Sequence, residues 1–376
     1  MKSIALAAVA HALLIGALAA PAAMAETTIS PASVAPSELT PLPLHIGGRV
    51  ESTGDGKMSI YAYQWPGTYF ETAFNGKDAY FQVGTGDVIL HALVDGKALA
   101  PMVKPPGGLY HIDGLAAGAH TLRIEVATES QAGADHFGGF FAAADATPGA
   151  LALRSRQIEF IGDSHTVGYG NISTTRECTT DQVWATTDDT QAFGPATAKH
   201  YDADYQVNAI SGRGIVRNYD GFAADHLPEA YPYLKFDKTM TDAPNRSWQP
   251  QVVVMALGTN DFSTPLKPTE KWKTREDLHA DYEKTYVAFI HSLRARYPGA
   301  YFVLWGTEMA NGEIEAEEQK VVDQVKAGGE TRITFLPING LAFSGCHSHP
   351  STADDRTISD LLVKTIDQVP NIWQGR

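Results

Sequence analysis

The sequence predicts two folded domains of different class, an all-β domain followed by an α/β domain. The first prediction rests on short β-rich runs between closely spaced turn signals over residues 41–153. The second rests on a change at about Gln157, after which five short apolar strands alternate with helical segments. A chain of 376 residues with 44 % hydrophobic content is long enough to bury a core in each domain.

The first 25 residues have the composition of a signal peptide. Lys2 precedes an alanine- and leucine-rich run, which ends in the small-residue segment Ala23-Met24-Ala25. We therefore expect cleavage near Ala25 and export to the periplasm or the extracellular space; a retained membrane anchor is the alternative. The proline-rich segment PASVAPSELTPLPL leads into the first domain, and residues 26–40 are expected to form a linker. No later apolar run has the length of a membrane span.

Residues 41–153 are predicted to form a β-sandwich or jelly roll. Turn signals recur at short spacing, at residues 54–56, 75–76, 95–96, 105–108 and 113–114. The runs between them are β-rich, and in HTLRIEVAT the apolar Leu122, Ile124 and Val126 alternate onto one face. Because this region contains no helical stripe, two packed antiparallel sheets are the expected architecture.

Residues 157–376 are predicted to form a parallel sheet with helices on both faces. The five strands are IEFIG (158–162), YQVNAI (205–210), QVVVMALG (251–258), YFVLWG (301–306) and RITFLPI (332–338). The longest helix is DYEKTYVAFIHSLRAR, which ends before Pro298-Gly299 and has one apolar face, formed by Tyr282, Tyr286, Phe289, Ile290 and Leu293. IEAEEQKVVDQVKAG and DDRTISDLLVKTIDQV predict two further helices.

Residues suited to acyl transfer follow the carboxyl ends of these strands, where open α/β sheets bind their ligands. Ser164 follows the first strand, Gly212 the second, Asn260 the third, and His347 and His349 the fifth. A serine becomes a nucleophile when a histidine takes its proton, and the reaction also needs donors for the oxyanion. The Ser164 amide, the Gly212 amide and the Asn260 side chain are the candidate donors, and either histidine is a candidate base.

The motifs around these residues resemble those of the SGNH/GDSL hydrolases. The serine lies in GDSH, not in the G-x-S-x-G elbow. GDS, SGRG, LGTND and a C-terminal HP are similar to four sequence blocks of that family. The resemblance implies a three-layer, flavodoxin-like domain with Ser164 as nucleophile and His349 as base. It also implies Gly212 and Asn260 as oxyanion donors beside the Ser164 amide.

The resemblance narrows to the family-2 carbohydrate esterases. IEFIGDSHTVGYGN, CTT, ISGRG and GCHSHP look like that family's second domain, and WPGTYFETAF and LAAGAHTLRI look like its N-terminal jelly roll. The likeness implies an exported enzyme that removes O-acetyl groups from a carbohydrate such as xylan, without a cofactor. The alternatives are an exported esterase for lipid, aryl or peptidoglycan O-acetyl esters, and a non-catalytic carbohydrate-binding protein. A net charge of -14 argues against nucleic acid as a partner. Oligomeric state is left open.

One position departs from the SGNH pattern. These proteins usually carry an aspartate two or three residues before the catalytic histidine, where this sequence has Cys346 and His347. Asp354 and Asp355 come shortly after His349, but they are placed to open the last helix. We therefore predict a Ser164–His349 dyad, with a backbone carbonyl orienting the histidine.

The two cysteines, Cys178 and Cys346, are expected to form a disulfide in an exported protein, with two separate thiols as the alternative. The CHSH segment offers soft ligands for zinc, but no fourth ligand accompanies them, so no metal is predicted.

Four further side chains are candidates for substrate contact. Tyr169, Trp184 and Trp248 are suited to stacking on a sugar ring, with core packing as the alternative. His165 either packs over the turn or reaches the substrate. Asp163, beside the serine, is interpreted as a structural residue that bonds local backbone amides.

Overall fold

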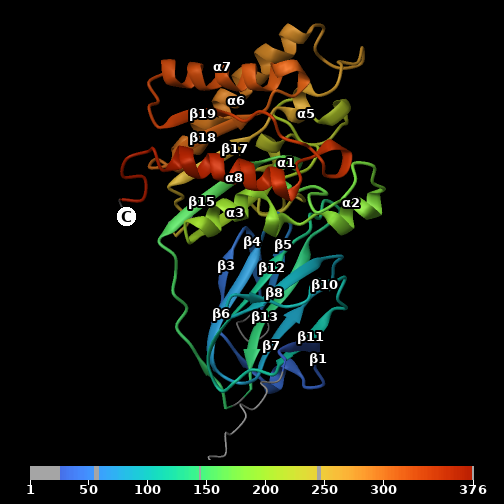
Figure 1. Cartoon of the computed structure of the whole chain (residues 1–376), viewed down its shortest axis with the longest axis vertical. Coiled ribbons are helices and arrows are strands. Elements are labelled where there is room, and N and C mark those ends of the chain that lie inside the picture. Colours follow the sequence, from blue (N-terminus) through green and yellow to red (C-terminus); the bar gives the residue numbers. More distant parts are fainter. Residues whose placement is uncertain (1–25, 55–58, 144, 244–246, 375–376) are drawn as a thin grey trace, which may run out of the picture.

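The computed structural model describes residues 26–54, 59–143, 145–243 and 247–374. The predicted signal peptide, residues 1–25, lies outside the described residues. Figure 1 shows a β-domain and an α/β domain stacked along the long axis of the molecule. Both predicted fold classes are confirmed: two antiparallel sheets in the first domain and a five-stranded parallel sheet in the second. In the part of the chain that the structure describes, no helix combines the length and apolar character needed to cross a bilayer.

The N-terminal domain is built from short strands, as the turn spacing predicts. They are β1 (Thr28–Pro31), β2 (Thr40–Pro41), β3 (His45–Gly47), β4 (Val50–Thr53), β5 (Ile60–Tyr63), β6 (Tyr69–Gly76), β7 (Ala79–Val83), β8 (Ile89–Val94), β9 (Lys97–Ala98), β10 (Met102–Val103), β11 (Gly108–Asp113), β12 (Gly118–Val126), β13 (Asp135–Ala142) and β14 (Thr147–Pro148). A 3-10 turn, η1 (Pro36–Glu38), lies between the first two. Part of the segment expected to be a linker is therefore ordered, because β1 pairs with β11.

Two sheets enclose the core of this domain. One has the order β1-β11-β7-β13-β5-β4, with β2 joined to β13, and the other has the order β10-β8-β12-β6-β14, with β3 and β9 joined to β6 and β8. Aromatic side chains fill the space between the sheets, among them Phe70, Phe81 and Phe137, each at most 2 % exposed. Alternation along the strands directs these side chains inward, which is the pattern of a sandwich.

The second domain has a parallel sheet of the flavodoxin-like order β16-β15-β17-β18-β19. Its strands are β15 (Arg156–Gly162), β16 (Ala203–Ala209), β17 (Val252–Ala256), β18 (Tyr301–Gly306) and β19 (Ile333–Pro337), at the positions of the five predicted runs. The central strands β17 and β18 are apolar almost throughout because both faces of the sheet are covered.

The helical elements of this domain are α1 (Ser164–Val167), α2 (Thr180–Thr186), η2 (Asp189–Gln191), α3 (Phe193–His200), η3 (Tyr219–Gly221), α4 (Leu227–Ala230), α5 (Thr259–Phe262), α6 (Arg275–Arg296), η4 (Ala310–Gly312), α7 (Glu313–Ala327), η5 (Cys346–Ser348) and α8 (Thr352–Ile366). Side chains of α6 and α7 pack with one face of the sheet, and side chains of α3 and α8 pack with the other. The buried side of α6 includes the five residues of the predicted apolar stripe.

The two domains meet along β16 and its neighbour β15. Tyr69, from β6, donates a hydrogen bond to Asp204 at the start of β16, with 2.7 Å between the oxygens. Arg49, which follows β3, is buried and pairs with the fully buried Glu159 in the middle of β15. The sandwich therefore supplies part of the core against which the parallel sheet is packed.

Candidate active site

The site lies beyond the carboxyl ends of β15, β16 and β17. Ser164 is the first residue of α1, directly after β15, and Asp163 caps this short helix by accepting the backbone N–H of His165 at 3.0 Å. Gly212 follows β16 with a φ of 81°, in the left-handed region that glycine adopts without strain. Asn260 is in α5, one turn beyond β17. These three residues are far apart in the sequence, and they come together at one edge of the sheet because each follows a parallel strand.

Ser164 and His349 form a hydrogen-bonded pair. The Oγ of Ser164 lies 2.8 Å from Nε2 of His349, and Nδ1 of His349 lies 2.9 Å from the backbone oxygen of Cys346. A carbonyl oxygen can only accept, so Nδ1 carries the proton and Nε2 keeps its lone pair. That tautomer accepts the proton of the Ser164 hydroxyl. The arrangement is the one required to convert a serine into a nucleophile.

Aromatic rings surround the imidazole of His349. The ring of Tyr169 lies 4.3 Å from it between centroids, and the ring of His165 meets it edge-on at 5.5 Å. Burial lowers the pKa of His349 to about 4, and the nearby His347 acts in the same direction. The imidazole is therefore neutral at neutral pH, as a general base must be at the start of a reaction.

Three groups beside Ser164 are suited to binding an oxyanion. Within the described residues, the backbone amides of Ser164 and Gly212 donate to no protein acceptor. Asn260 lines the same cavity, and its Nδ2 lies 3.0 Å from Oδ2 of Asp163 and 2.9 Å from the carbonyl of Arg213. The Asn260 amide is thus held in place by two acceptors, and it would share or exchange one of them to bind an oxyanion.

A small cavity opens over these groups. Its volume is about 260 Å³, and its lining residues are Ser164, Tyr169, Ser211, Gly212, Tyr219, Phe222, Asn260, His347 and His349. Ligand sites for drug-sized molecules usually measure about 300–1,000 Å³. The space beside the hydroxyl of Ser164 therefore suits a small acyl group.

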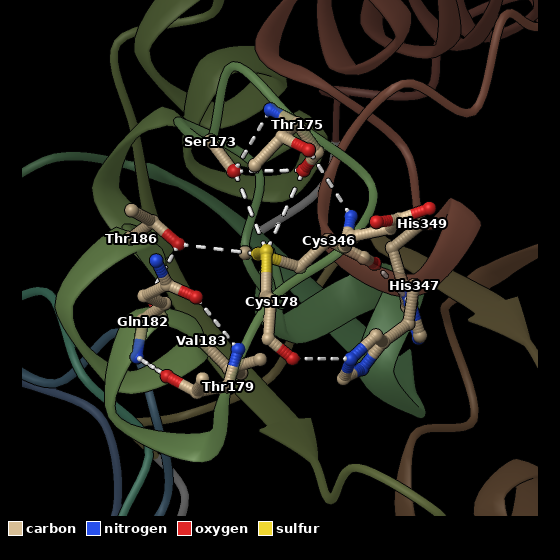
Figure 2. Close-up of a disulfide and its surroundings, with 12 residues drawn as sticks. Ser173, Thr175, Cys178, Thr179, Gln182, Val183, Thr186, Cys346, His347 and His349 are labelled. Carbon is tan, nitrogen blue, oxygen red and sulfur yellow. Dashed lines mark hydrogen bonds between the residues drawn. A yellow bond between two sulfur atoms is a disulfide. The ribbon is translucent and has the colours of Figure 1, made fainter.

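A disulfide joins Cys178 to Cys346, as predicted, and leaves no free cysteine among the described residues. Figure 2 shows the bond beside the turn that carries His349, with the His347 ring directed at the carbonyl of Cys178, 2.8 Å from its Nε2. Gly170 makes room for the bond, because a Cβ there would lie 2.4 Å from that of Cys346. Oxidation also removes the thiolate that a zinc site would have used.

His347 is a neighbour of the pair and does not contact Ser164. Its Nε2 donates to the carbonyl of Cys178, so its Nδ1 is free to accept the hydroxyl proton of Tyr169 across 3.1 Å. The ring of Tyr169 in turn packs, tilted by 32°, against that of His349, so a chain of contacts connects Cys178 to the imidazole of the candidate base.

The acids near the site serve the local backbone. Asp354 caps α8 in a capping box with Ser351 and also accepts the amides of Ala342 and Phe343. Asp355 accepts the side chain of Asn171 and the amide of Phe193. Within the described residues neither carboxylate contacts His349, which agrees with the expected orientation by a carbonyl.

The structure separates the four candidates for substrate contact. Tyr169 lines the cavity. His165 is 4 % exposed and packs between Trp305, Phe343 and His349, and burial lowers its pKa to about 3. Trp184 lies on α2 under the ammonium of Lys104, and Trp248 packs in the core, where its indole N–H donates to Glu159. Neither tryptophan lines the cavity.

Apart from Ser211, which belongs to the SGRG motif, two cavity residues were not identified from the sequence. Tyr219 and Phe222 are 53 % and 43 % exposed, and both line the cavity. Both residues follow the SGRG motif by fewer than a dozen residues. Their closeness in sequence to Gly212 could therefore have indicated that they lie near the site.

Comparisons with known proteins agree with this architecture. The family model described as "Carbohydrate esterase 2 N-terminal" matches residues 46–150, and that of the "GDSL-like Lipase/Acylhydrolase family" matches residues 160–360. An acetylxylan esterase / glucomannan deacetylase of Cellvibrio japonicus is 47 % identical over 336 residues, which cover 89 % of this chain and 93 % of that protein. The cellulase/esterase CelE of Acetivibrio thermocellus is 30 % identical over 80 % of this chain, but only 37 % of its own length is matched.

Solved structures show the same two-domain arrangement. A carbohydrate esterase structure, described as displaying divergent catalytic and non-catalytic binding functions at its active site, superposes with a TM-score of 0.83 at 45 % identity. The superposition covers 89 % of this chain and 100 % of the chain of that esterase. A family-two carbohydrate esterase from Clostridium thermocellum in complex with cellohexaose has a TM-score of 0.77 at 26 % identity, covering 88 % and 100 % of the two chains.

These matches span both domains and include the segments that contain Ser164, Gly212, Asn260 and His349. The chain belongs to the family-2 carbohydrate esterases, within the GDSL-like lipases and acylhydrolases, and is therefore a carboxylic ester hydrolase.

Proposed function

We propose that the enzyme removes O-acetyl groups from carbohydrates, with Ser164 as nucleophile and His349 as base. The observation that carries this proposal is the 2.8 Å hydrogen bond between the two side chains, both of which line a cavity of about 260 Å³. An acetyl group fits such a space beside the serine hydroxyl.

The reaction follows from the tautomer of the histidine. Ser164 Oγ attacks the acetyl carbonyl carbon while its proton passes to Nε2 of His349. The carbonyl oxygen becomes an oxyanion facing the amides of Ser164 and Gly212, with the Asn260 side chain at the same wall. When the ester bond breaks, Nε2 returns the proton to the sugar hydroxyl. Water then attacks the acetyl-enzyme by the same route and releases acetate.

The walls of the cavity favour a sugar as the leaving group. The exposed Tyr219 and Phe222 line it together with Tyr169, and aromatic rings of this kind stack against the apolar faces of pyranose rings. Acetylated xylan and acetylated glucomannan are the candidate substrates, because the Cellvibrio japonicus relative is an acetylxylan esterase / glucomannan deacetylase.

We also infer that the enzyme is exported. The Cys178–Cys346 disulfide supports this inference, since such bonds persist in oxidising compartments outside the cytosol. Mass spectrometry of the mature protein from its native host tests the cleavage of the signal peptide and the disulfide, because it identifies the N-terminal residue and the oxidation state of the cysteines.

The catalytic proposal is tested by acyl-chain selectivity. We expect kcat/KM to be far higher for 4-nitrophenyl acetate than for the octanoate, and acetate to be released from acetylated xylan or glucomannan. Ser164→Ala should abolish turnover while the circular dichroism spectrum is retained. Comparable rates on acetate and octanoate would instead favour a lipase-like enzyme, and an active Ser164→Ala protein would remove the assigned nucleophile.

A further inference from the structure

Two side chains of the β-sandwich hold the backbone of Ser211, the residue before Gly212. Glu129 and Gln131 lie between β12 and β13, and the amide of Ser211 donates to Oε1 of Glu129 at 2.7 Å. The Nε2 of Gln131 donates to the carbonyl of Ser211 at 3.1 Å and lies 3.0 Å from the same Oε1. Both polar groups of the Ser211 backbone are therefore bound by the other domain.

The geometry of the peptide bond carries this contact into the cavity. The carbonyl of Ser211 and the N–H of Gly212 belong to one peptide unit, and none of the described peptide bonds is cis. In a planar trans peptide these two groups point in opposite directions. A bond that fixes the direction of the Ser211 carbonyl therefore fixes the direction of the Gly212 N–H. Accepting a hydrogen bond at the carbonyl also strengthens the amide as a donor, by about 10–30 % in condensed-phase estimates.

Gly212 needs such support because its own backbone is permissive. Its φ of 81° is accessible to glycine, but glycine also populates the other regions readily. The Arg213 amide donates to the carbonyl of Ile210 at 3.2 Å, and the carbonyl of Gly212 accepts the amide of Tyr219 at 2.9 Å. Among the described contacts, only those of Glu129 and Gln131 reach the Ser211 backbone from outside the α/β domain.

The segment that carries the two side chains is itself tied to the α/β domain. The carbonyl of Ala127, directly after β12, accepts the amide of Asp189 at 2.9 Å. Glu129 is half-buried, so its carboxylate is held between the two domains and not in free solvent. The contact with Ser211 is thus part of the domain interface.

We propose that Glu129 and Gln131 are positioning residues for the oxyanion hole, so that the β-sandwich contributes to acyl transfer through the Gly212 amide. The proposal rests on the proposed function, because it takes that amide as an oxyanion donor. It predicts that losing the contact at Ser211 slows catalysis, whereas losing an interdomain contact elsewhere affects stability alone.

The test compares four variants with the wild-type enzyme on 4-nitrophenyl acetate. Glu129→Ala removes the acceptor for the Ser211 amide, and Glu129→Gln keeps an oxygen there without the charge. Gln131→Glu replaces the donor to the Ser211 carbonyl with an acceptor. Tyr69→Phe is the matched control, because it removes the interdomain hydrogen bond to Asp204 at the opposite end of β16.

We expect kcat/KM to fall about tenfold in Glu129→Ala and Gln131→Glu, which is part of the loss of about 10²–10³ seen when an oxyanion donor is removed outright. Affinity for methylboronic acid, whose tetrahedral adduct with Ser164 places an oxygen in the oxyanion site, should weaken by a similar factor. Glu129→Gln should retain most of both. Tyr69→Phe should lower Tm with kcat/KM and inhibitor affinity unchanged.

Unchanged kcat/KM in both Glu129→Ala and Gln131→Glu would overturn the proposal. So would an equal loss of activity in a Tyr69→Phe enzyme of matched stability, because the interface would then act only by holding the domains together. Hydrogen exchange at residues 211–212 gives a readout without substrate, and it should accelerate in Glu129→Ala. An enzyme that cleaves 4-nitrophenyl acetate but no acetylated carbohydrate would refute the proposed substrate and leave this comparison intact.

Discussion

The imidazole of His349 and the backbone of Cys346 are joined by a 2.9 Å hydrogen bond, and the sulfur of Cys346 is bonded to Cys178. A neutral carbonyl thus has the orienting role that a carboxylate has in a Ser-His-Asp triad. It fixes the tautomer of His349, but it stabilises the imidazolium less than a carboxylate does. The direction of the base consequently depends on a covalent link to the loop before α2.

Reducing this disulfide should lower both activity and stability. The bond spans 168 residues of sequence, and disulfides typically contribute about 2–4 kcal/mol to the free energy of unfolding. We expect kcat on 4-nitrophenyl acetate to fall in Cys178→Ser and in the reduced wild-type enzyme, since the Cys346 carbonyl then moves more freely. The chain has only these two cysteines, so a reductant acts at a single bond. Full activity with both thiols shown free by alkylation would contradict the prediction.

The pH–rate profile should have its acid limb below the ordinary pKa of histidine, 6.5. Burial lowers the pKa of His349 to about 4, so the base stays neutral, and kcat/KM stays high, well below pH 6. The unfolded chain binds the proton more readily, so this histidine's contribution to stability is complete above about pH 6.5 and is lost as the pH falls toward 4. Burial shifts the pKa of His165 in the same direction. An acid limb at pH 6.5 or higher would show that the base is more easily protonated than its surroundings imply.

Neutralising the two acids at the start of α8 should leave catalysis largely intact. Asp354 caps the helix, and Asp355 binds Asn171 and Phe193. Asp354→Asn and Asp355→Asn are expected to lower Tm modestly and to keep kcat within a few-fold of wild type, whereas His349→Ala should lose nearly all activity. Loss of kcat in either variant as severe as in His349→Ala would mean that a carboxylate assists the base directly.

Removing the buried arginine between the domains should destabilise the protein strongly. Arg49 and Glu159 have side chains that are 1 % and 0 % exposed, and breaking a buried pair on one side typically costs about 3–5 kcal/mol. We expect Arg49→Leu to lower the free energy of unfolding by a corresponding amount, which urea denaturation measures as a lower midpoint. Lys104→Ala is the matched control, because the pair of Lys104 with Asp87 is exposed and should contribute about 0–1 kcal/mol. Equal midpoints for the two variants would contradict the expected difference.

The sequence predicted the site residues where they follow directly from the strands of the sheet. Short runs that include apolar residues marked the strands of the parallel sheet, and Ser164, Gly212 and Asn260 follow three of them within a few residues, so strand order alone brought them to one edge. The absence of an aspartate before His349 was likewise visible in the chain, and the carbonyl of Cys346 stands in its place.

Contacts between distant segments had no such pattern. Glu129 and Gln131 lie in a polar turn of the sandwich, and nothing local marks them as partners of Ser211. Trp184 and Trp248 were candidates by residue type alone, and that type is equally common in cores. The helix α3 was not anticipated, because its sequence FGPATAKH has low helix propensity and is stabilised by packing against α8.

The position of β16 at the edge of the sheet affects whether the α/β domain can be produced without the sandwich. This strand forms one border of the parallel sheet, where only β15 is its hydrogen-bonded neighbour, yet all seven of its residues are buried. Contacts from the sandwich, such as those of Tyr69 with Asp204 and Tyr205, cover it. A fragment beginning near residue 157 would expose the sandwich-facing side of this strand together with its unpaired backbone edge, which could then pair with other chains. We therefore expect the N-terminal domain to protect its neighbour against aggregation, so that the α/β half is less soluble when it is expressed alone than the whole chain is.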